Sequence, residues 1–400
     1  MTKHGILDKA DIALDVAILL VAGLMMLIAG VLLFPVSRGV IPYYENGLYG
    51  LLLFIFALQT AMLGRTPFGD RARSRGLLVA GTVIASVGIV TCFIPGALAH
   101  VPRILLFVCF GPGGLALLLQ MLLAEDKLRS WVRYGGIVGR LALACGSVYA
   151  LSILVGALVW RHSSLATHAA AIVVLLYGLS IIYLAVVLQR IYRRYPQATG
   201  SFDGDSNLAP DKVMILMTGF FMLILGVLLV PVNLGILPFS ASAQLGLLAI
   251  IHAIQMIAFG STPIGAFPRS WLLVLLGSVF AVLGITSCIV PGVLVPCLTL
   301  IVAALNILGG IIGVRKACAP LLRKSEQPGE PLPGILVSLF RTQLTMNLLS
   351  ILFGASMLVS GIIPALAIGV ILAANGCLLL FLLRILVTLE RMQRNVETAA

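Results

Sequence analysis

The sequence predicts an all-α polytopic membrane protein with about 12 transmembrane helices, and three observations lead to that prediction. Hydrophobic residues make up 60% of the 400 residues and charged residues only 10%, whereas a soluble globular chain is usually about a quarter charged. The apolar residues also form long runs, and about 20 such residues are enough for a helix to cross a bilayer. Finally, these runs lack the alternation of a barrel strand, so helices must satisfy the backbone in lipid.

The apolar runs predict helices that pair as three helical hairpins in each half of the chain. The first run is too long for the core of a signal peptide and lacks a small-residue cleavage site, so we interpret it as the first transmembrane helix. The expected spans are 12–35, 47–64, 76–95, 104–124, 137–160, 169–189, 213–231, 245–260, 271–290, 297–314, 335–361 and 365–386.

The basic residues predict how the helices are oriented. The net charge is +12, but Lys and Arg lie in short loops between apolar runs and not in a stripe on a soluble domain, so we expect no nucleic-acid partner. When the loops are assigned to alternate sides, one side holds nearly all of these residues and the other holds only Arg38, Arg103 and Arg161. Because basic loops stay in the cytoplasm, we expect both termini there, in a plasma membrane of the bacterial inner-membrane kind.

An internal repeat divides the chain. Gly-Val-Leu-Leu-x-Pro-Val at 30–36 returns 196 positions later at 226–232, and the same offset pairs Thr66-Pro67-x-Gly69 with Thr262-Pro263-x-Gly265. We therefore expect a first six-helix repeat at 1–189, a cytoplasmic linker at 190–212 and a second six-helix repeat at 213–400. Since each repeat would cross the membrane an even number of times, the two would be parallel repeats.

The hairpins carry a pattern of their own, in which two glycines seven residues apart precede a proline, as in Gly23, Gly30 and Pro35. This pattern resembles the short-repeat membrane family typified by the HdeD acid-resistance protein. The resemblance implies an inner-membrane location and a role in stress protection, and it supplies no catalytic residues.

The layout of the predicted helices also resembles the major facilitator superfamily, which has two parallel six-helix halves. The segment from Gly69 to Arg75 stands where that superfamily has a Gly/Asp/Arg loop motif. The second half departs from the motif, because Ala266 and Phe267 replace Asp70 and Arg71.

Residues suited to catalysis are scarce in the predicted spans. No Asp or Glu lies in the middle of a span, and the sequence lacks the HExxH, GxSxG and Walker motifs. The seven cysteines are unclustered and lie mostly in apolar runs, as small core residues do. We therefore expect no enzyme activity, no cofactor and no metal.

Polar residues near the predicted midplane are the candidates for a substrate cavity between the two halves. His252 and Gln255 share one helix face, and two pairs of equivalent positions stay polar while changing residue, Tyr149 with Asn347 and Tyr177 with Asn375. The candidate cavity residues are Gln59, Tyr149, Tyr177, His252, Gln255, Asn347 and Asn375. The alternative is that these side chains only form hydrogen bonds between helices.

Three histidines are expected in the outer loops, His100, His162 and His168. Imidazole titrates near pH 6.5, so they are candidates for pH sensing. Ordinary solvated loops are the alternative.

Two functions follow from these patterns. One is a solute permease or exporter with its site between the repeats, acting on an uncharged or weakly polar solute. The other is a non-transporting, HdeD-like membrane stress protein that acts through packing, partners or the bilayer. The sequence leaves open whether the chain forms a homo-oligomer.

Overall fold

The computed structural model describes residues 8–123, 136–161, 167–198, 208–323, 334–359 and 364–399. Within these ranges, 12 helices are long and apolar enough to cross a membrane, which confirms the all-α polytopic fold. They are α1 (Leu14–Ser37), α2 (Glu45–Leu58), α3 (Arg75–Phe93), α4 (Val101–Leu123), α6 (Gly136–Trp160), α7 (His168–Arg194), α8 (Pro210–Asn233), α9 (Ala241–Ile254), α10 (Trp271–Ile289), α11 (Val295–Arg323), α12 (Gly334–Leu358) and α13 (Ala365–Ala399).

Short elements follow α2 and α9 in the same order. Each helix continues into a five-residue π-helix, η1 (Gln59–Leu63) or η3 (Gln255–Phe259). A glycine in the left-handed region ends each of them, Gly64 at φ 67° and Gly260 at φ 68°. Two antiparallel two-stranded ribbons come next: β1 (Arg65–Thr66) with β2 (Gly69–Asp70), and β3 (Ser261–Thr262) with β4 (Gly265–Ala266).

Three helices run well past the ends predicted from hydropathy. The expected ends were residues 189, 314 and 386, but α7 continues to Arg194, α11 to Arg323 and α13 to Ala399. Hydropathy marks where a chain leaves the hydrocarbon, whereas a helix continues as long as its backbone bonds can form.

The chain forms two compact units. The first contains Met1–Asn207, Ser240–Gly260 and Pro268–Val295, and the second contains Leu208–Phe239, Ser261–Phe267 and Pro296–Ala400. The first unit therefore includes α9 and α10, which the expected division of the sequence assigns to the second repeat. The expected boundaries of the repeats stay a prediction.

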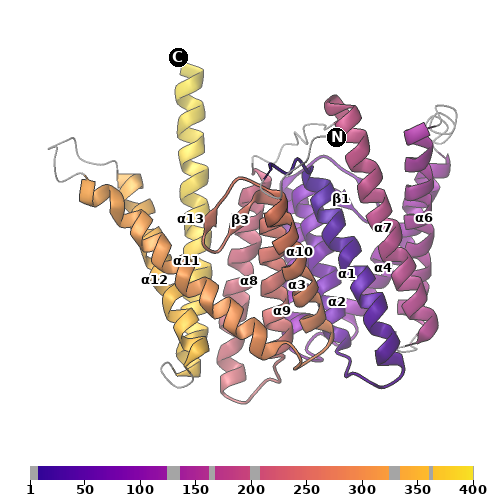
Figure 1. The fold of residues 1–400 in the computed structure, drawn as a ribbon, viewed down its shortest axis with the longest axis horizontal. Coiled ribbons are helices and arrows are strands. Elements are labelled where there is room, and N and C mark those ends of the chain that lie inside the picture. The colour runs from indigo at the N-terminus through magenta and orange to yellow at the C-terminus, as the bar shows by residue number, and fades with distance from the viewer. Residues whose placement is uncertain are drawn as a thin grey trace. The chain divides into compact units, whose positions relative to one another are not determined.

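Two helical hairpins, α2–α3 and α9–α10, pack against each other in the first unit (Figure 1). Glycines bring the helices of each hairpin into backbone contact. A Cβ atom on Gly50 would lie 2.4 Å from the carbonyl oxygen of Gly88, and one on Gly246 would lie 2.6 Å from that of Gly284. Small residues at such crossings allow the close packing that holds helices together in lipid, where no hydrophobic force acts between them.

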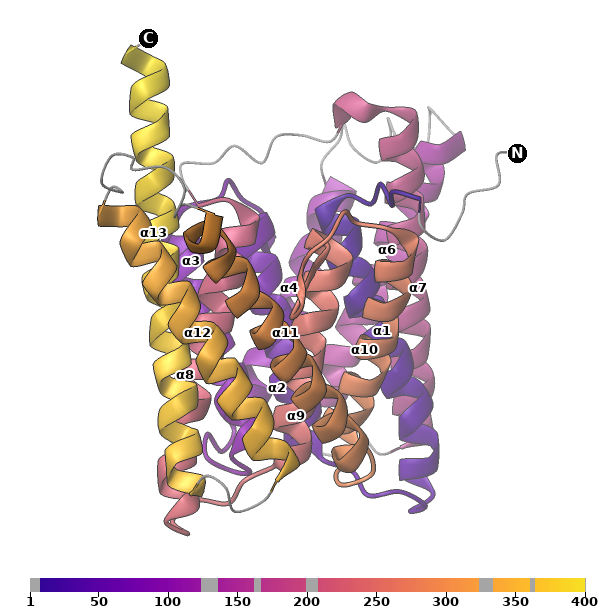
Figure 2. The same ribbon diagram turned by 60° about the vertical axis from the view of Figure 1, so that its left-hand side comes forward.

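Helices α1, α4, α6 and α7 complete the first unit. The helices α1 and α7 lie side by side (Figure 2), and a Cβ atom on Gly30 would lie 2.6 Å from the backbone nitrogen of Leu175. At the start of the described chain, Lys9 forms a β-bridge with Ser270, and the guanidinium of Arg269 donates to the carbonyl of Ala10 at 3.0 Å. These contacts anchor the segment before α1 on the loop before α10.

In the second unit, α8 packs against α13 and α11 against α12. A Cβ atom on Gly226 would lie 2.2 Å from the backbone nitrogen of Ala373, and one on Gly354 would lie 2.7 Å from the carbonyl oxygen of Ala303. The Lys212 ammonium at the start of α8 forms an ion pair with Glu390 on α13. Close glycine contacts therefore hold helices together in both units.

Candidate functional site

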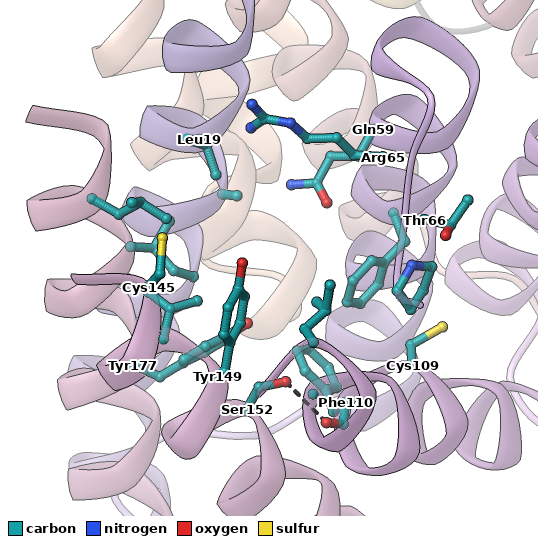
Figure 3. A pocket seen from close by; sticks show the side chains of 18 of the residues that line it. Leu19, Gln59, Arg65, Thr66, Cys109, Phe110, Cys145, Tyr149, Ser152 and Tyr177 are labelled. Atoms are coloured by element: carbon teal, nitrogen blue, oxygen red, sulfur yellow. Dashed lines mark hydrogen bonds between the residues drawn. The ribbon is translucent and has the colours of Figure 1, made fainter. Parts of the chain in front are cut away.

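A cavity of about 490 Å³ lies inside the first unit. Side chains from α1, α2, α4, α6 and α7 line it, together with the β1–β2 ribbon (Figure 3). Most of the lining residues are apolar. A concave, mostly apolar cavity with a few polar groups is the usual form of a small-molecule site.

The apolar wall contains a row of aromatic rings. The ring of Phe110 on α4 meets that of Phe56 edge-on, with centroids 5.1 Å apart, and that of Tyr177 on α7 in the same way at 5.8 Å. Ser152 on α6 donates its hydroxyl to the carbonyl of Phe110 at 3.0 Å. This hydrogen bond gives the buried hydroxyl a partner and links α6 to α4 beside the aromatic rings.

Polar residues gather at one end of the cavity because the chain turns there. After η1, the left-handed Gly64 turns the backbone into the β1–β2 ribbon, where Arg65 and Asp70 are paired across the two strands. Gln120 on α4 holds the ribbon by donating its amide to the carbonyl of Phe68 at 2.8 Å. The lining residues at this end, which we call the polar end, are Gln59, Arg65, Thr66, Asp70 and Gln120.

A buried carboxylate fixes the arginine at this end. The guanidinium of Arg65 lies 3.2 Å from Asp15 on α1, whose side chain is only 3% exposed. Asp15 also accepts hydrogen bonds from the Tyr192 hydroxyl at 2.5 Å and from the backbone N–H of Val16 at 2.8 Å. A buried charge is tolerated only when it is paired and hydrogen-bonded, and these three donors meet that condition.

The second carboxylate near Arg65 is held more loosely. Asp70 lies 3.8 Å from the Nε atom of Arg65, and its side chain is 83% exposed. The positive charge of Arg65 is thus shared between one buried and one accessible carboxylate.

Of the seven cavity residues named from the sequence, three line this cavity: Gln59, Tyr149 and Tyr177. Figure 3 shows the amide of Gln59 and the hydroxyl of Tyr149 pointing into the space. His252 lies on α9 with its Nδ1 atom buried and without a hydrogen-bond partner, and Gln255 begins η3. Both belong to the first unit but neither is among the residues that line the cavity.

The remaining two candidates, Asn347 and Asn375, belong to the second unit. Asn347 on α12 lies against Gly313 of α11, where a Cβ atom would be 2.4 Å from its side-chain oxygen. The side-chain oxygen of Asn375 on α13 is buried and has no hydrogen-bond partner. A common cavity for all seven residues stays a prediction.

The two candidate pH-sensing histidines that the structure describes, His100 and His168, are not among the residues that line the cavity. His100 is exposed in the turn before α4, and His168 is the exposed first residue of α7, with its ring edge-on to Phe34. His162 lies outside the described residues.

The ion pair of Asp15 and Arg65 at the polar end was not predicted from the sequence. Asp15 and Arg65 are 50 positions apart, and each resembles an ordinary charge beside a transmembrane span. The repeat held a signal nevertheless, because at the same offset of 196 Ser261 replaces Arg65 and Ala266 replaces Asp70. The second ribbon forms without this charged pair of Arg65 and Asp70, so the pair is not needed to build the hairpin.

The fold and the cavity define the class of the protein: a polytopic α-helical membrane protein with a small-molecule-sized cavity inside its first unit. Among the described residues, no group of three or more His, Cys, Asp or Glu side chains could hold a metal ion. Comparison of the chain with family models, with curated proteins and with solved structures gives no match.

Proposed function

We propose that the protein is a solute permease or exporter and that the cavity of the first unit is its binding site. The observation that supports this proposal is the combination of an aromatic and aliphatic wall with a polar end that contains Arg65 and Asp70. A bundle that only needs to pack in lipid has no use for a cavity of about 490 Å³, because empty space costs packing energy. The site inside one repeat takes the place of the site between repeats that we expected from the sequence.

The orientation of the site follows from the positive-inside rule. The loop from Arg65 to Arg75 is rich in arginine, so we place the polar end at the cytoplasmic face, with both termini on the same side. In a bacterial cell this face would be that of the inner membrane. A solute would then enter the cavity from the cytoplasm, with its polar part last.

The second part of the proposal concerns the origin of the fold in two parallel repeats. The 14-residue helices α2 and α9, their five-residue π-helices and their ribbons recur with the same lengths at one offset. Only the first of the two ribbons carries the Arg65 and Asp70 pair. We infer that duplication supplied the scaffold and that later changes adapted the first repeat to bind the solute.

The test combines a filled cavity with a matched control. Ala22 on α1 lines the cavity, and Ala22→Phe would fill part of it; Ala157→Phe adds the same bulk at an exposed position of α6. The purified protein is scanned by thermal unfolding against neutral, cationic and anionic hydrophobic solutes. Each solute that stabilises it is then loaded into proteoliposomes and its release is followed.

We expect at least one solute to raise the unfolding temperature of the wild type and of Ala157→Phe but not of Ala22→Phe. A solute at about 100 times its Kd stabilises a protein by about 2.7 kcal/mol, which such a scan detects. The same solute should leave proteoliposomes faster with the wild type or Ala157→Phe than with Ala22→Phe or without protein. If no solute stabilises or crosses, and loss of the protein lowers survival in acid, the HdeD-like stress function replaces this proposal.

A further inference from the structure

We propose that the cavity takes a lipophilic molecule with a single positive charge, which lies at Asp70 while its apolar body lies against the aromatic wall. This inference rests on the proposed function and names the substrate class of the same site. It replaces the uncharged or weakly polar solute that we expected from the sequence.

The charges at the polar end favour a cation. Among the lining residues, Arg65 and Asp70 carry charge, and Asp15 lies directly behind Arg65. Counted by themselves, these two carboxylates and one guanidinium carry one net negative charge. Asp15 is buried and holds Arg65 at 3.2 Å. Asp70 is 83% exposed and lies 3.8 Å from Arg65, so its carboxylate is the one that a ligand can reach.

The wall of the cavity also favours a cation. The faces of aromatic rings are negative and attract ammonium and similar groups, more strongly when water is excluded. Phe56, Phe110, Tyr149 and Tyr177 line the cavity together with the sulfur-bearing side chains of Met25, Met26 and Met121. The same negative ring faces would repel an organic anion of this size. The guanidinium of Arg65 would not offset that repulsion, since it already pairs with Asp15.

The amide groups at the polar end fit the same ligand. Gln120 uses its nitrogen to hold the carbonyl of Phe68, which leaves its oxygen beside Gly69 as an acceptor. A cationic head group needs acceptors, and the Gln120 amide oxygen from α4 and the Asp70 carboxylate from the ribbon provide them.

A competing charge lies outside the cavity. Arg71 lines a separate, more open hollow together with Phe68, Asp70 and Gln120. It is not among the residues that line the cavity itself. Anion binding at this arginine is therefore the competing outcome in the test.

The test uses two probes of the same shape and opposite charge, tetraphenylphosphonium and tetraphenylborate. Their binding to the purified full-length protein is measured by isothermal titration calorimetry. The variant is Asp70→Asn, whose side chain is exposed, so the fold should tolerate it. The control is Asp211→Asn, which removes an exposed carboxylate from α8 in the second unit.

We expect the wild type to bind tetraphenylphosphonium more tightly than tetraphenylborate. Loss of one carboxylate close to the ligand should weaken the binding of the cation by about tenfold, and Asp211→Asn should leave it unchanged. Equal binding of the two probes by the wild type, or unchanged binding of the cation by Asp70→Asn, would overturn the inference.

The outcomes also separate this inference from the proposed function. If a neutral solute binds and Ala22→Phe abolishes its binding while the cation does not bind, the cavity remains the site and only the substrate class is wrong. If Ala22→Phe leaves the binding of every probe unchanged, both proposals fail.

Discussion

The backbone N–H of Tyr44 donates to the carbonyl of Ile289 at 2.9 Å, and at the equivalent positions Ser240 donates to Phe93 at 3.0 Å. Phe93 and Ile289 are the last residues of α3 and α10. The final carbonyls of a helix have no partner within the helix, and here the residue before α2 or α9 supplies one. The hairpins α2–α3 and α9–α10 therefore cap each other, although they are about half the chain apart.

The unpaired hydroxyl of Tyr43 beside this cap should lower stability. It is buried without a hydrogen-bond partner. Removing such a group should raise the free energy of unfolding by about 1 kcal/mol. We expect Tyr43→Phe to raise the unfolding temperature, whereas Tyr195→Phe, at an exposed tyrosine, should leave it unchanged. A lower unfolding temperature in Tyr43→Phe would show that the hydroxyl has a partner.

The same tyrosine should make the fold sensitive to alkali. Burial, with a smaller effect of Glu45, raises the pKa of Tyr43 well above its ordinary value of 10.0. The unfolded chain therefore releases this proton as the pH rises above about 10 while the folded chain keeps it, so folding stability falls in that range. Unfolding followed from pH 8 to pH 11 should show a smaller alkaline loss in Tyr43→Phe than in the wild type.

A methyl group at Gly30 should separate α1 from α7. Its Cβ atom would lie 2.6 Å from a backbone atom of Leu175, which cannot move as the end of a side chain can. We expect Gly30→Ala to lower the free energy of unfolding by about 1–3 kcal/mol. Thermal unfolding in detergent measures this change. Gly76→Ala is the matched control: its nearest neighbour would be 3.8 Å away, so it should be neutral or slightly stabilising.

The pair formed by Asp15 and Arg65 should show strong coupling. Arg65→Gln leaves the buried carboxylate of Asp15 with fewer hydrogen-bond donors. We expect this variant to lower the free energy of unfolding by about 2 kcal/mol. Adding Asp15→Asn should recover part of that loss, because the remaining groups are neutral. A double-mutant cycle measures the coupling. Arg75→Gln, at an exposed arginine, is the control, and additive effects in the cycle would contradict the pairing.

The segment before α1 should loosen when Arg269 is replaced. Its guanidinium donates to the carbonyls of Ala10 and Ala258, both at 3.0 Å. We expect Arg269→Gln to speed amide hydrogen exchange at residues 8–12 while the centres of the helices stay protected. Arg38→Gln, at an exposed arginine, should not change the exchange. Unchanged exchange in Arg269→Gln would mean that the backbone bridge of Lys9 and Ser270 suffices.

Much of the fold was predictable because lipid restricts the choice of structure. The span expected at 76–95 is α3 (Arg75–Phe93), and the span expected at 271–290 is α10 (Trp271–Ile289). The candidate site was less accessible. Tyr149 and Tyr177 were predictable as site residues because polar side chains are rare in apolar runs. Asp15 and Arg65 lie near other charged residues, so the sequence does not distinguish them from ordinary loop charges.

The sequence by itself determined that the chain forms membrane-spanning helices, where most of them begin and end, and which segments resemble one another. These properties depend on the local pattern of apolar residues, because only a long apolar helix is stable in the hydrocarbon core of a bilayer. Only the tertiary structure decided that α9 and α10 join the first unit, that Arg65 reaches Asp15 and that a cavity remains between α1, α4, α6 and α7. Such contacts depend on how close two helices can approach, and that is set by glycines and side chains far apart in the chain.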